Sequence, residues 1–244
     1  PPRNAPSREH DRRAEGGEIR EDGRVTEPSL RRLYLDTAEA TLGLVGDPRV
    51  AHGWADASVL AGLTVGALAS HTARSVLQVE NFLDAGEPQA AGDDGTQDPV
   101  DAGGYFAGVA GLDDPGSAVN TGVRDRAALM AADGPQSLVA DMAGCLRRLT
   151  ARLPDEPAGR RVTAFGGQPM ALDEYLRTRL VEFCVHADDL ALSIGAGPSA
   201  LPEVALRVAV DVLVGTAVTR HGAPAVLRAL ARRERDAVAA LRVL

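Results

Sequence analysis

The chain has 244 residues, 45% of them hydrophobic and 25% charged, which is typical of a globular protein with its own core and excludes wholesale disorder. Aromatic residues make up only 3%, so the core must be built mainly from Ala, Leu and Val, as between closely packed helices. The formal net charge of −8 repels phosphate backbones and argues against a nucleic-acid partner.

The first part of the chain predicts a leader followed by two helices. Residues 1–27 are rich in charged residues, Gly and Pro and lack an apolar run, so we expect a flexible leader rather than a signal peptide. From Pro28 onward, apolar residues in helical spacing predict a helix that ends near Gly46. Thr64 is positioned to cap a second helix over about 65–85. The inward face of this second helix is formed by Leu68, His71, Thr72, Ser75, Val79 and Phe82.

Two segments beside this second helix are predicted as loops. Residues 52–62 contain little helical periodicity, and residues 86–122 are rich in Gly, Asp and Pro. Loops as long as the second are usually functional when they lie inside a domain. We therefore expect residues 86–122 to contribute to substrate specificity.

The middle of the chain returns to helical patterns. Helices are predicted at about 123–132 and 136–152. A Gly-Gly pair at 166–167 between two short extended runs predicts a small two-residue β-hairpin. A strong helical pattern then runs over about 172–194 and ends at Gly195.

The last part of the chain, residues 202–244, predicts two more helices with a break at 221–224. The stretch 201–218 is almost apolar enough to span a membrane. Its charged residues, however, recur every four positions with alternating sign, at Glu203, Arg207 and Asp211. This pattern predicts a partly buried surface helix and no membrane partner. The fold class expected is all-α, with four main helices, a helical C-terminal extension over 196–244 and at most one small β-hairpin.

The two cysteines, Cys145 and Cys184, lie far apart and in no metal-binding or redox spacing. They predict a reducing compartment, and hence a cytoplasmic location, without a disulfide framework. Since Cys184 is two residues from Glu182, it points to a different side of the same predicted helix. We interpret it as a buried core thiol.

One line of ionisable residues stands out in the predicted helix over 172–194. Residues three and four apart share a helix face, and this face carries Arg179, Glu182, His186 and Asp189. Glu182 and His186 are one turn apart, which aims both side chains at the same point. Burying a carboxylate beside this apolar core is costly unless a cation or a metal compensates its charge.

A third residue, His71, faces inward from another helix. Two His and one Glu from two helices would form a three-ligand site with an open position, as in catalytic zinc sites. The spacing alone leaves a second interpretation open. A core histidine bonded to a backbone carbonyl, beside an ion pair between Arg179 and Glu182, would produce the same pattern.

Two stretches resemble a known family. Residues 58–71, SVLAGLTVGALASH, followed by Arg74, resemble the signature of the mycothiol-dependent maleylpyruvate isomerase family, and residues 179–190, RLVEFCVHADDL, are similar to its second signature. These proteins are DinB-like metal-binding four-helix bundles, and the resemblance covers residues 28–195. Leu63 departs from the pattern, because relatives commonly place Trp there. The pattern of residues 202–244 predicts helices only, whereas the isomerases of the family have a C-terminal α/β domain.

The resemblance implies a metal site and a thiol cosubstrate. The family's ligands carry over onto His71, Glu182 and His186, and the expected cofactors are a divalent metal, usually Zn²⁺, and mycothiol. A metal can hold a coordinating thiol as the thiolate, so no protein cysteine is needed. The expected partner is a small-molecule electrophile, attacked by the thiol in a transferase or a cis-trans isomerase. The protein is expected to be a monomer or a homodimer.

Three further residues are candidates for contact with substrate or cosubstrate. Arg179 could hold a substrate carboxylate as a catalytic residue, or pair with Glu182 or Asp189. Arg74 and Gln78 are assigned to cofactor binding, although Gln78 fits equally a position on the rim of the bundle. Two other functions use the same pattern: a hydrolase with a metal-bound water, and a non-catalytic helical module that binds a small molecule.

Overall fold

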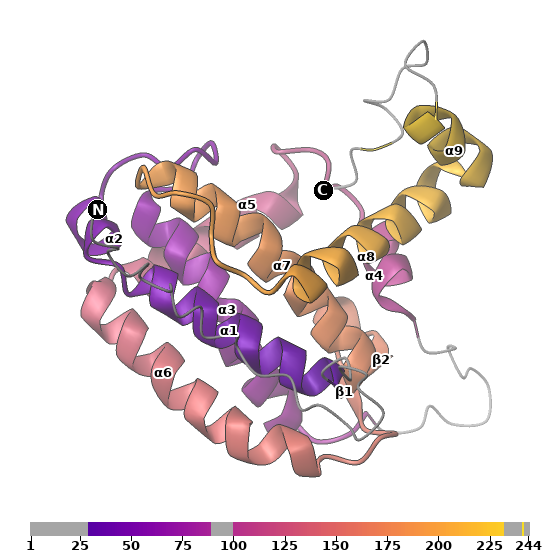
Figure 1. Cartoon of the computed structure of the whole chain (residues 1–244), viewed down its shortest axis with the longest axis horizontal. Coiled ribbons are helices and arrows are strands. Elements are labelled where there is room, and N and C mark those ends of the chain that lie inside the picture. Colours follow the sequence, from indigo (N-terminus) through magenta and orange to yellow (C-terminus); the bar gives the residue numbers. More distant parts are fainter. Residues whose placement is uncertain (1–28, 89–99, 232–240, 242–244) are drawn as a thin grey trace, which may run out of the picture.

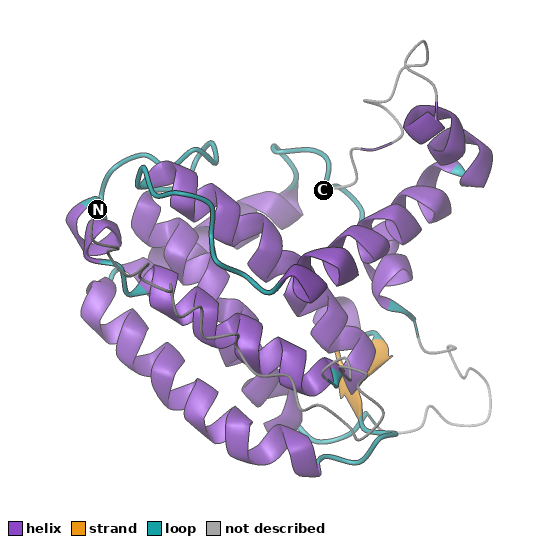
Figure 2. Cartoon of the chain, in the orientation of Figure 1, coloured by secondary structure: helices purple, strands orange, loops and turns teal. Residues whose placement is uncertain are grey.

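The computed structural model describes residues 29–88, 100–231 and 241. Within these residues the chain is mainly helical, with one small antiparallel sheet (Figures 1 and 2). The helices are α1 (Leu30–Val45), α2 (Pro48–His52), α3 (Val65–Asp84), α4 (Ala102–Gly108), α5 (Ala118–Ala131), α6 (Gly134–Arg152), α7 (Leu172–Ser193), α8 (Glu203–His221) and α9 (Ala223–Ala231). The prediction of an all-α fold is confirmed. The predicted leader, residues 1–27, lies outside the described residues.

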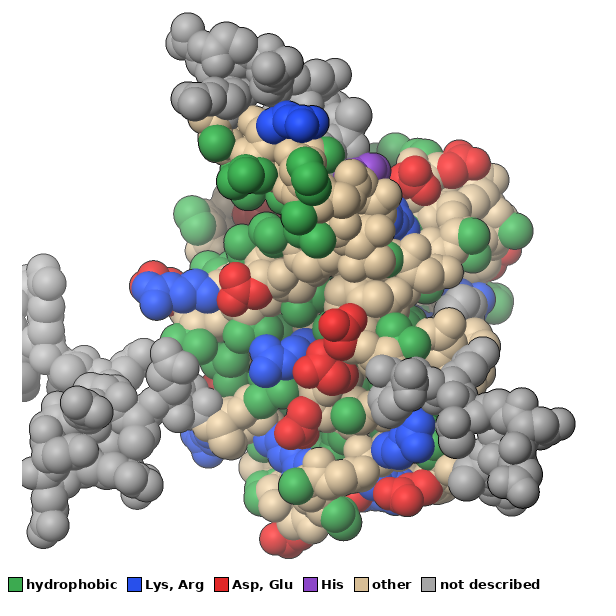
Figure 3. All heavy atoms as spheres, turned by 90° about the vertical axis from the view of Figure 1, so that its right-hand side faces the viewer, with side chains coloured by type: hydrophobic (Ala, Val, Ile, Leu, Met, Phe, Trp, Pro, Cys, Tyr) green, Lys and Arg blue, Asp and Glu red, His purple; other side chains and the backbone are tan. Residues whose placement is uncertain are grey.

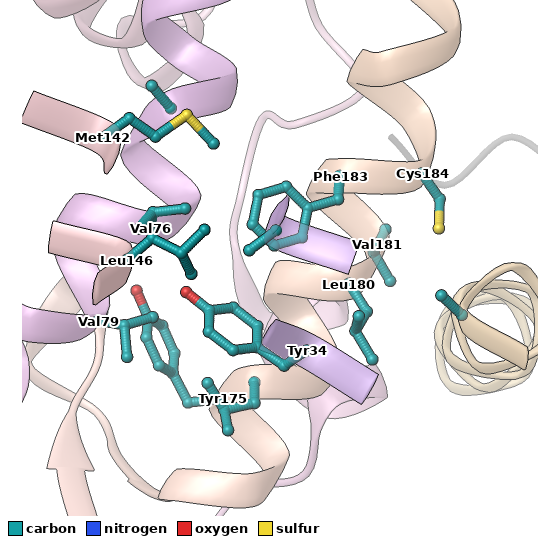
Figure 4. Packing of buried hydrophobic residues seen from close by; sticks show 14 of the residues in the cluster. Tyr34, Val76, Val79, Met142, Leu146, Tyr175, Leu180, Val181, Phe183 and Cys184 are labelled. Carbon is teal, nitrogen blue, oxygen red and sulfur yellow. The ribbon is translucent and has the colours of Figure 1, made fainter. Parts of the chain in front are cut away.

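Helices α1, α3, α6 and α7 form the four-helix bundle. Helix α1 packs against α6 and α7, and α3 packs against the same two helices, so the four close a ring. Buried side chains of all four helices meet inside it, among them Tyr34, Val76, Met142 and Phe183 (Figure 4). The Tyr34 and Phe183 rings lie 5.7 Å apart between centroids. Tyr34, Tyr175 and Phe183 are thus buried in a core that is otherwise mainly aliphatic.

Helices α3 and α7 begin and end where their capping residues predict. The Thr64 hydroxyl accepts a hydrogen bond of 3.1 Å from the backbone N–H of Ala67, at the start of α3. At the C-terminal end of α7, Gly195 has a φ of +61°, and the N–H of Ala196 donates to the carbonyl of Ala191 at 2.8 Å. These caps fix the two helices that carry the candidate ligands.

The loop predicted over residues 52–62 is confirmed except at its first residue, His52, which ends the short helix α2 capped by Asp47. The second loop prediction is wrong in part. Within residues 86–122, helix α4 forms at 102–108 and α5 begins at Ala118. Helix α4 contains three glycines, so its intrinsic helix propensity is low. It is stabilised instead by packing against α7 and α8, which the local sequence does not reveal.

The small hairpin forms as predicted, but with a longer turn. Strand β1 (Arg161–Thr163) pairs with β2 (Pro169–Ala171), and the last pair is Thr163 with Pro169. The turn therefore spans residues 164–168 and includes the 3₁₀ turn η2 (Phe165–Gly167). A second 3₁₀ turn, η1 (Leu153–Asp155), follows α6. Gly166 and Gly167 both have φ above +80°, which explains the glycine pair.

Helices α8 and α9 confirm the predicted helices and the break between them, where Gly222 has a φ of +81°. Helix α8 packs against α7 and α4. Figure 3 shows hydrophobic side chains gathered over α8 and α9 on one face of the molecule. The exposed apolar residues of these two helices include Leu206, Val210, Leu227 and Leu230. Among the described residues, none of the helices combines the length and apolarity needed to cross a membrane.

Close contact between Gly66 and Trp54 predicts a test of the packing around α3. A Cβ atom at position 66 would lie 2.5 Å from Cε2 of Trp54, whose indole N–H donates to the carbonyl of Ala131. We expect Gly66→Ala to lower the free energy of unfolding by about 1–3 kcal/mol. Chemical denaturation measures the change. Gly43→Ala, at an open position in α1, should instead stabilise the protein by about 0.4–1 kcal/mol. The same change in the free energy of unfolding for both variants would contradict the prediction.

Candidate metal centre

Three polar side chains converge where α3 faces α7. His71 extends from α3, and Glu182 and His186 extend from α7 one turn apart. The Nε2 atoms of the two histidines are 3.1 Å apart. The Glu182 Oε2 atom lies 3.4 Å from Nε2 of His71 and 3.3 Å from Nε2 of His186. One atom from α3 and two from α7 therefore form a compact triangle of possible metal ligands.

The triangle fits a tetrahedral metal ion. Metal–ligand distances of 2.0–2.1 Å, typical of zinc, place the ligands of a tetrahedron about 3.3–3.5 Å from one another. The three observed separations, 3.1 to 3.4 Å, are close to that spacing. Two imidazoles and one carboxylate are also the donor set found in catalytic zinc sites, with a fourth position left for another ligand. These residues are thus able to hold a divalent cation.

Asp189 supports the histidine on α7. Its Oδ2 atom lies 3.1 Å from Nδ1 of His186, so a proton on Nδ1 is favoured and Nε2 faces His71 and Glu182. Histidines that bind metals commonly donate their second N–H to a carboxylate in this way, which fixes the ring and raises its basicity. The sequence places Asp189 on the same face as His186, and the structure shows their contact.

The charged and hydrogen-bonding groups around the triangle favour the ionised form of Glu182. Burial opposes the ionised form of Glu182, but hydrogen bonds to both histidines and the nearby Arg179 lower its pKa well below the usual range. Burial lowers the pKa of His71. Burial also opposes the charged form of His186, yet hydrogen bonds to Asp189 and Glu182 raise its pKa to about 9. His71 is therefore ready to coordinate at neutral pH, and His186 must first release a proton.

Arg179 is buried beside the triangle with partners of its own. Its guanidinium lies 3.8 Å from Oε1 of Glu182 and stacks 4.9 Å from the ring centroid of Tyr175. The Nε–H also donates to the hydroxyl of Thr178 at 3.0 Å. The ion pair with Glu182 is one of the two interpretations that the sequence left open. These contacts hold Arg179 next to the carboxylate.

A pocket opens from the triangle. Its wall on α3 includes His71, Arg74, Ser75 and Gln78, so both residues assigned to cofactor binding lie at this pocket. The pocket contains about 650 Å³ of empty space, part of it open to solvent. Sequence reasoning missed the residues that line its other side, Tyr105, Phe106, Val119, Val123 and Arg126. Tyr105, Phe106 and Val119 lie where a loop had been predicted, whereas Val123 and Arg126 lie in the part of α5 that had been predicted as a helix. The Asp101 cap before an aromatic pair was the available signal.

The two cysteines are not placed for nucleophilic chemistry. Both are buried free thiols, and burial raises the pKa of each to about 12. Cys184 points away from the cluster around Tyr34 and Phe183 (Figure 4). Its interpretation as a buried core thiol is confirmed. A sulfur nucleophile acting at the pocket would have to come from another molecule.

Comparison with known proteins adds a family to this geometry. The family model described as the mycothiol maleylpyruvate isomerase N-terminal domain matches residues 34–191, more than half of the chain. No curated protein and no solved structure matched the chain. The matched region includes His71, Glu182 and His186 and all four helices of the bundle except the first four residues of α1 and the last two of α7. The chain therefore belongs to the mycothiol maleylpyruvate isomerase N-terminal domain family.

Proposed function

We propose that the protein is a metal-dependent enzyme that activates mycothiol, or a similar small thiol, for attack on an electrophilic small molecule. The observation that carries the proposal is the triangle of His71, Glu182 and His186, two of which, His71 and Glu182, line a pocket. The family adds the thiol, because its description names mycothiol. The absence of a usable cysteine in the pocket lining agrees with a nucleophile supplied by a cosubstrate.

Each residue has a separate task in this proposal. His71, Glu182 and His186 would hold the cation, and Asp189 would orient His186. A divalent cation such as Zn²⁺ supplies the Lewis acidity that keeps a coordinated thiol ionised at neutral pH. Arg179 balances the charge of Glu182 and keeps its carboxylate in place. Arg74 and Gln78 line the pocket, where they would contact the bound thiol or the electrophile.

Two reactions use the same activated thiol. In an isomerase, the sulfur adds to a conjugated double bond, the new single bond rotates, and elimination returns the thiol with the geometry of the product changed. In a transferase, the carbon–sulfur bond persists and the adduct is released. Both need one nucleophilic sulfur and an electrophile beside the triangle.

Turnover assays test the proposal and separate the two reactions. Zinc-loaded protein is incubated with mycothiol and either a cis-enedione or a bimane electrophile whose thiol adduct fluoresces. We expect thiol-dependent turnover of at least one of them. A trans product with mycothiol regenerated identifies an isomerase, and a stable adduct identifies a transferase. Equal rates with and without mycothiol would contradict the proposal.

The contact between Asp189 and His186 gives a test of metal binding. Asp189→Ala removes the acceptor for Nδ1–H, and we expect it to weaken zinc affinity about 10–100-fold. Competition with a chromogenic chelator measures the affinity. Asp188→Ala, at the neighbouring exposed position on α7, removes the same charge and should leave the affinity unchanged. Equal losses of zinc affinity in the two variants would show that Asp189 acts through its negative charge alone and not through its contact with His186.

A further inference from the structure

Tyr105 brings a hydroxyl group to the pocket from α4. The residue is almost enclosed, with 8% of its surface exposed. Its ring packs edge to face against the ring of the neighbouring Phe106, at 5.4 Å between centroids. The small part of Tyr105 that stays accessible lies where the residue borders the pocket.

The Tyr105 hydroxyl has no partner within the protein. Among the described residues, none accepts a hydrogen bond from it or donates one to it. The hydroxyl of Tyr175 on α7 also lacks a partner, and it is completely buried, whereas that of Tyr105 is not. The Tyr105 hydroxyl therefore keeps access to the space of the pocket. An enclosed tyrosine hydroxyl usually finds a hydrogen-bond partner, and a ligand in the pocket would supply one.

Charged residues at the triangle lie close enough to influence this hydroxyl. Burial raises the pKa of Tyr105, the positive charge of Arg179 lowers it, and the negative charge of Glu182 raises it. Helix α4 packs against α7, which carries both charged residues. Because the net effect is a raised pKa, Tyr105 stays protonated at neutral pH and is able to donate a hydrogen bond.

The helix that carries Tyr105 is held in place on both sides of it. Glu174 accepts a 3.0 Å hydrogen bond from the N–H of Ala102, and Arg220 donates to the carbonyl of Phe106 at 2.9 Å. The donor is thus fixed before a ligand arrives. A donor of this kind stabilises negative charge that develops on a reacting molecule without the cost of reorganisation.

We propose that Tyr105 is a catalytic residue whose O–H donates a hydrogen bond to the carbonyl oxygen of the electrophile. The inference deepens the proposed function and rests on it for the attack by sulfur. When the thiolate sulfur adds to a double bond conjugated with that carbonyl, the carbon–sulfur bond forms and the π electron pair moves onto the oxygen. Tyr105 would stabilise the resulting enolate. Elimination returns the pair to sulfur in an isomerase, and in a transferase the enolate carbon takes a proton from water.

A chromophoric aldehyde tests this hydrogen bond without turnover. In 4-(dimethylamino)cinnamaldehyde, light moves electron density from the amine to the carbonyl oxygen, so a hydrogen bond to that oxygen shifts the absorption band to longer wavelength. Binding is measured on the full chain after removal of metal with a chelator and without thiol. The band of the bound probe should lie at longer wavelength in the wild type than in Tyr105→Phe, which should bind the probe about 2–10-fold more weakly.

Tyr175→Phe is the matched control. It removes a hydroxyl that is buried without a partner and does not line the pocket, so the band and the affinity should stay as in the wild type. In zinc-loaded protein with mycothiol and the cis-enedione, Tyr105→Phe should lower kcat about 100–1,000-fold, the cost of removing one donor to a developing oxyanion. Helix content and metal content are measured for both variants and should not change.

Four results would overturn the inference. A probe that does not bind to the wild type, or a band at the same position in the wild type and Tyr105→Phe, would exclude the hydrogen bond. A shift retained in Tyr105→Phe and lost in Arg74→Gln would assign the donor to Arg74. An unchanged kcat in Tyr105→Phe would exclude the catalytic role. If the zinc-loaded wild type shows no thiol-dependent turnover, the proposed function fails, while the bands in metal-free protein still decide whether Tyr105 donates to a bound carbonyl.

Discussion

His71→Ala is expected to abolish stoichiometric metal binding and to reduce thiol-dependent turnover to the background rate. Alanine removes one corner of the triangle and leaves Glu182 and His186, both from α7, as the remaining donors. Loss of a residue that only supports a ligand costs about 10–100-fold in metal affinity, so we expect loss of a ligand itself to exceed 100-fold. Metal analysis of the purified variant and a chelator competition measure both effects.

The fold should survive this substitution, because the His71 side chain borders the pocket and does not belong to the hydrophobic core of the bundle. Circular dichroism should therefore show unchanged helix content. His52→Ala, on the exposed surface of α2, is the matched control and should retain metal and turnover. Glu182→Gln keeps the size of the side chain but removes its charge, and it should also lose metal. Full metal content in both His71→Ala and Glu182→Gln would exclude the triangle as the site.

Arg179→Met is expected to destabilise the metal-free protein by about 3–5 kcal/mol. The substitution keeps an apolar stem beside Tyr175 but removes one of the two cationic neighbours of Glu182, the other being His186, and breaking a buried pair by removing one partner has costs of this size. In zinc-loaded protein the bound zinc ion also compensates the charge of Glu182, so the loss in free energy of unfolding relative to the wild type should be smaller. Urea denaturation of both proteins, with and without zinc, measures the two differences.

Arg177→Met on the same helix provides the control for this prediction. Arg177 forms a partly exposed ion pair of 3.2 Å with Glu174, and pairs of this kind contribute about 0–1 kcal/mol. We expect Arg177→Met to lower the free energy of unfolding by the same small amount with and without zinc. If Arg179→Met destabilises the metal-free and the zinc-loaded proteins equally, Glu182 does not exchange its cationic partner for the metal.

The parts of the fold predicted from sequence are those governed by local signals. Thr64 caps α3 and Gly195 ends α7, and both residues act through hydrogen bonds within their own helix ends. The triangle was predictable for a related reason. Glu182 and His186 are one turn apart on a helix with clear boundaries, and His71 lies on a strongly periodic face.

The remaining part of the pocket depends on contacts between distant residues. Helix α4 begins next to Glu174, 72 residues further along the chain, and its end is held by Arg220, 114 residues after Phe106. No local pattern reveals such anchors, and the glycines of α4 indicate a loop instead. The interaction of Arg74 with Arg126 likewise arises only when α5 packs against α3. The three residues of the triangle could thus be predicted, whereas the pocket residues contributed by α4 could not.

Titration of the cobalt-substituted protein with mycothiol tests the central claim most directly. Cobalt(II) replaces zinc in tetrahedral sites and reports its ligands through its absorption spectrum. We expect a thiolate-to-cobalt charge-transfer band that grows with added mycothiol, saturates at a one-to-one ratio and does not appear in His71→Ala. A spectrum that remains unchanged at saturating mycothiol would contradict thiol activation at this site.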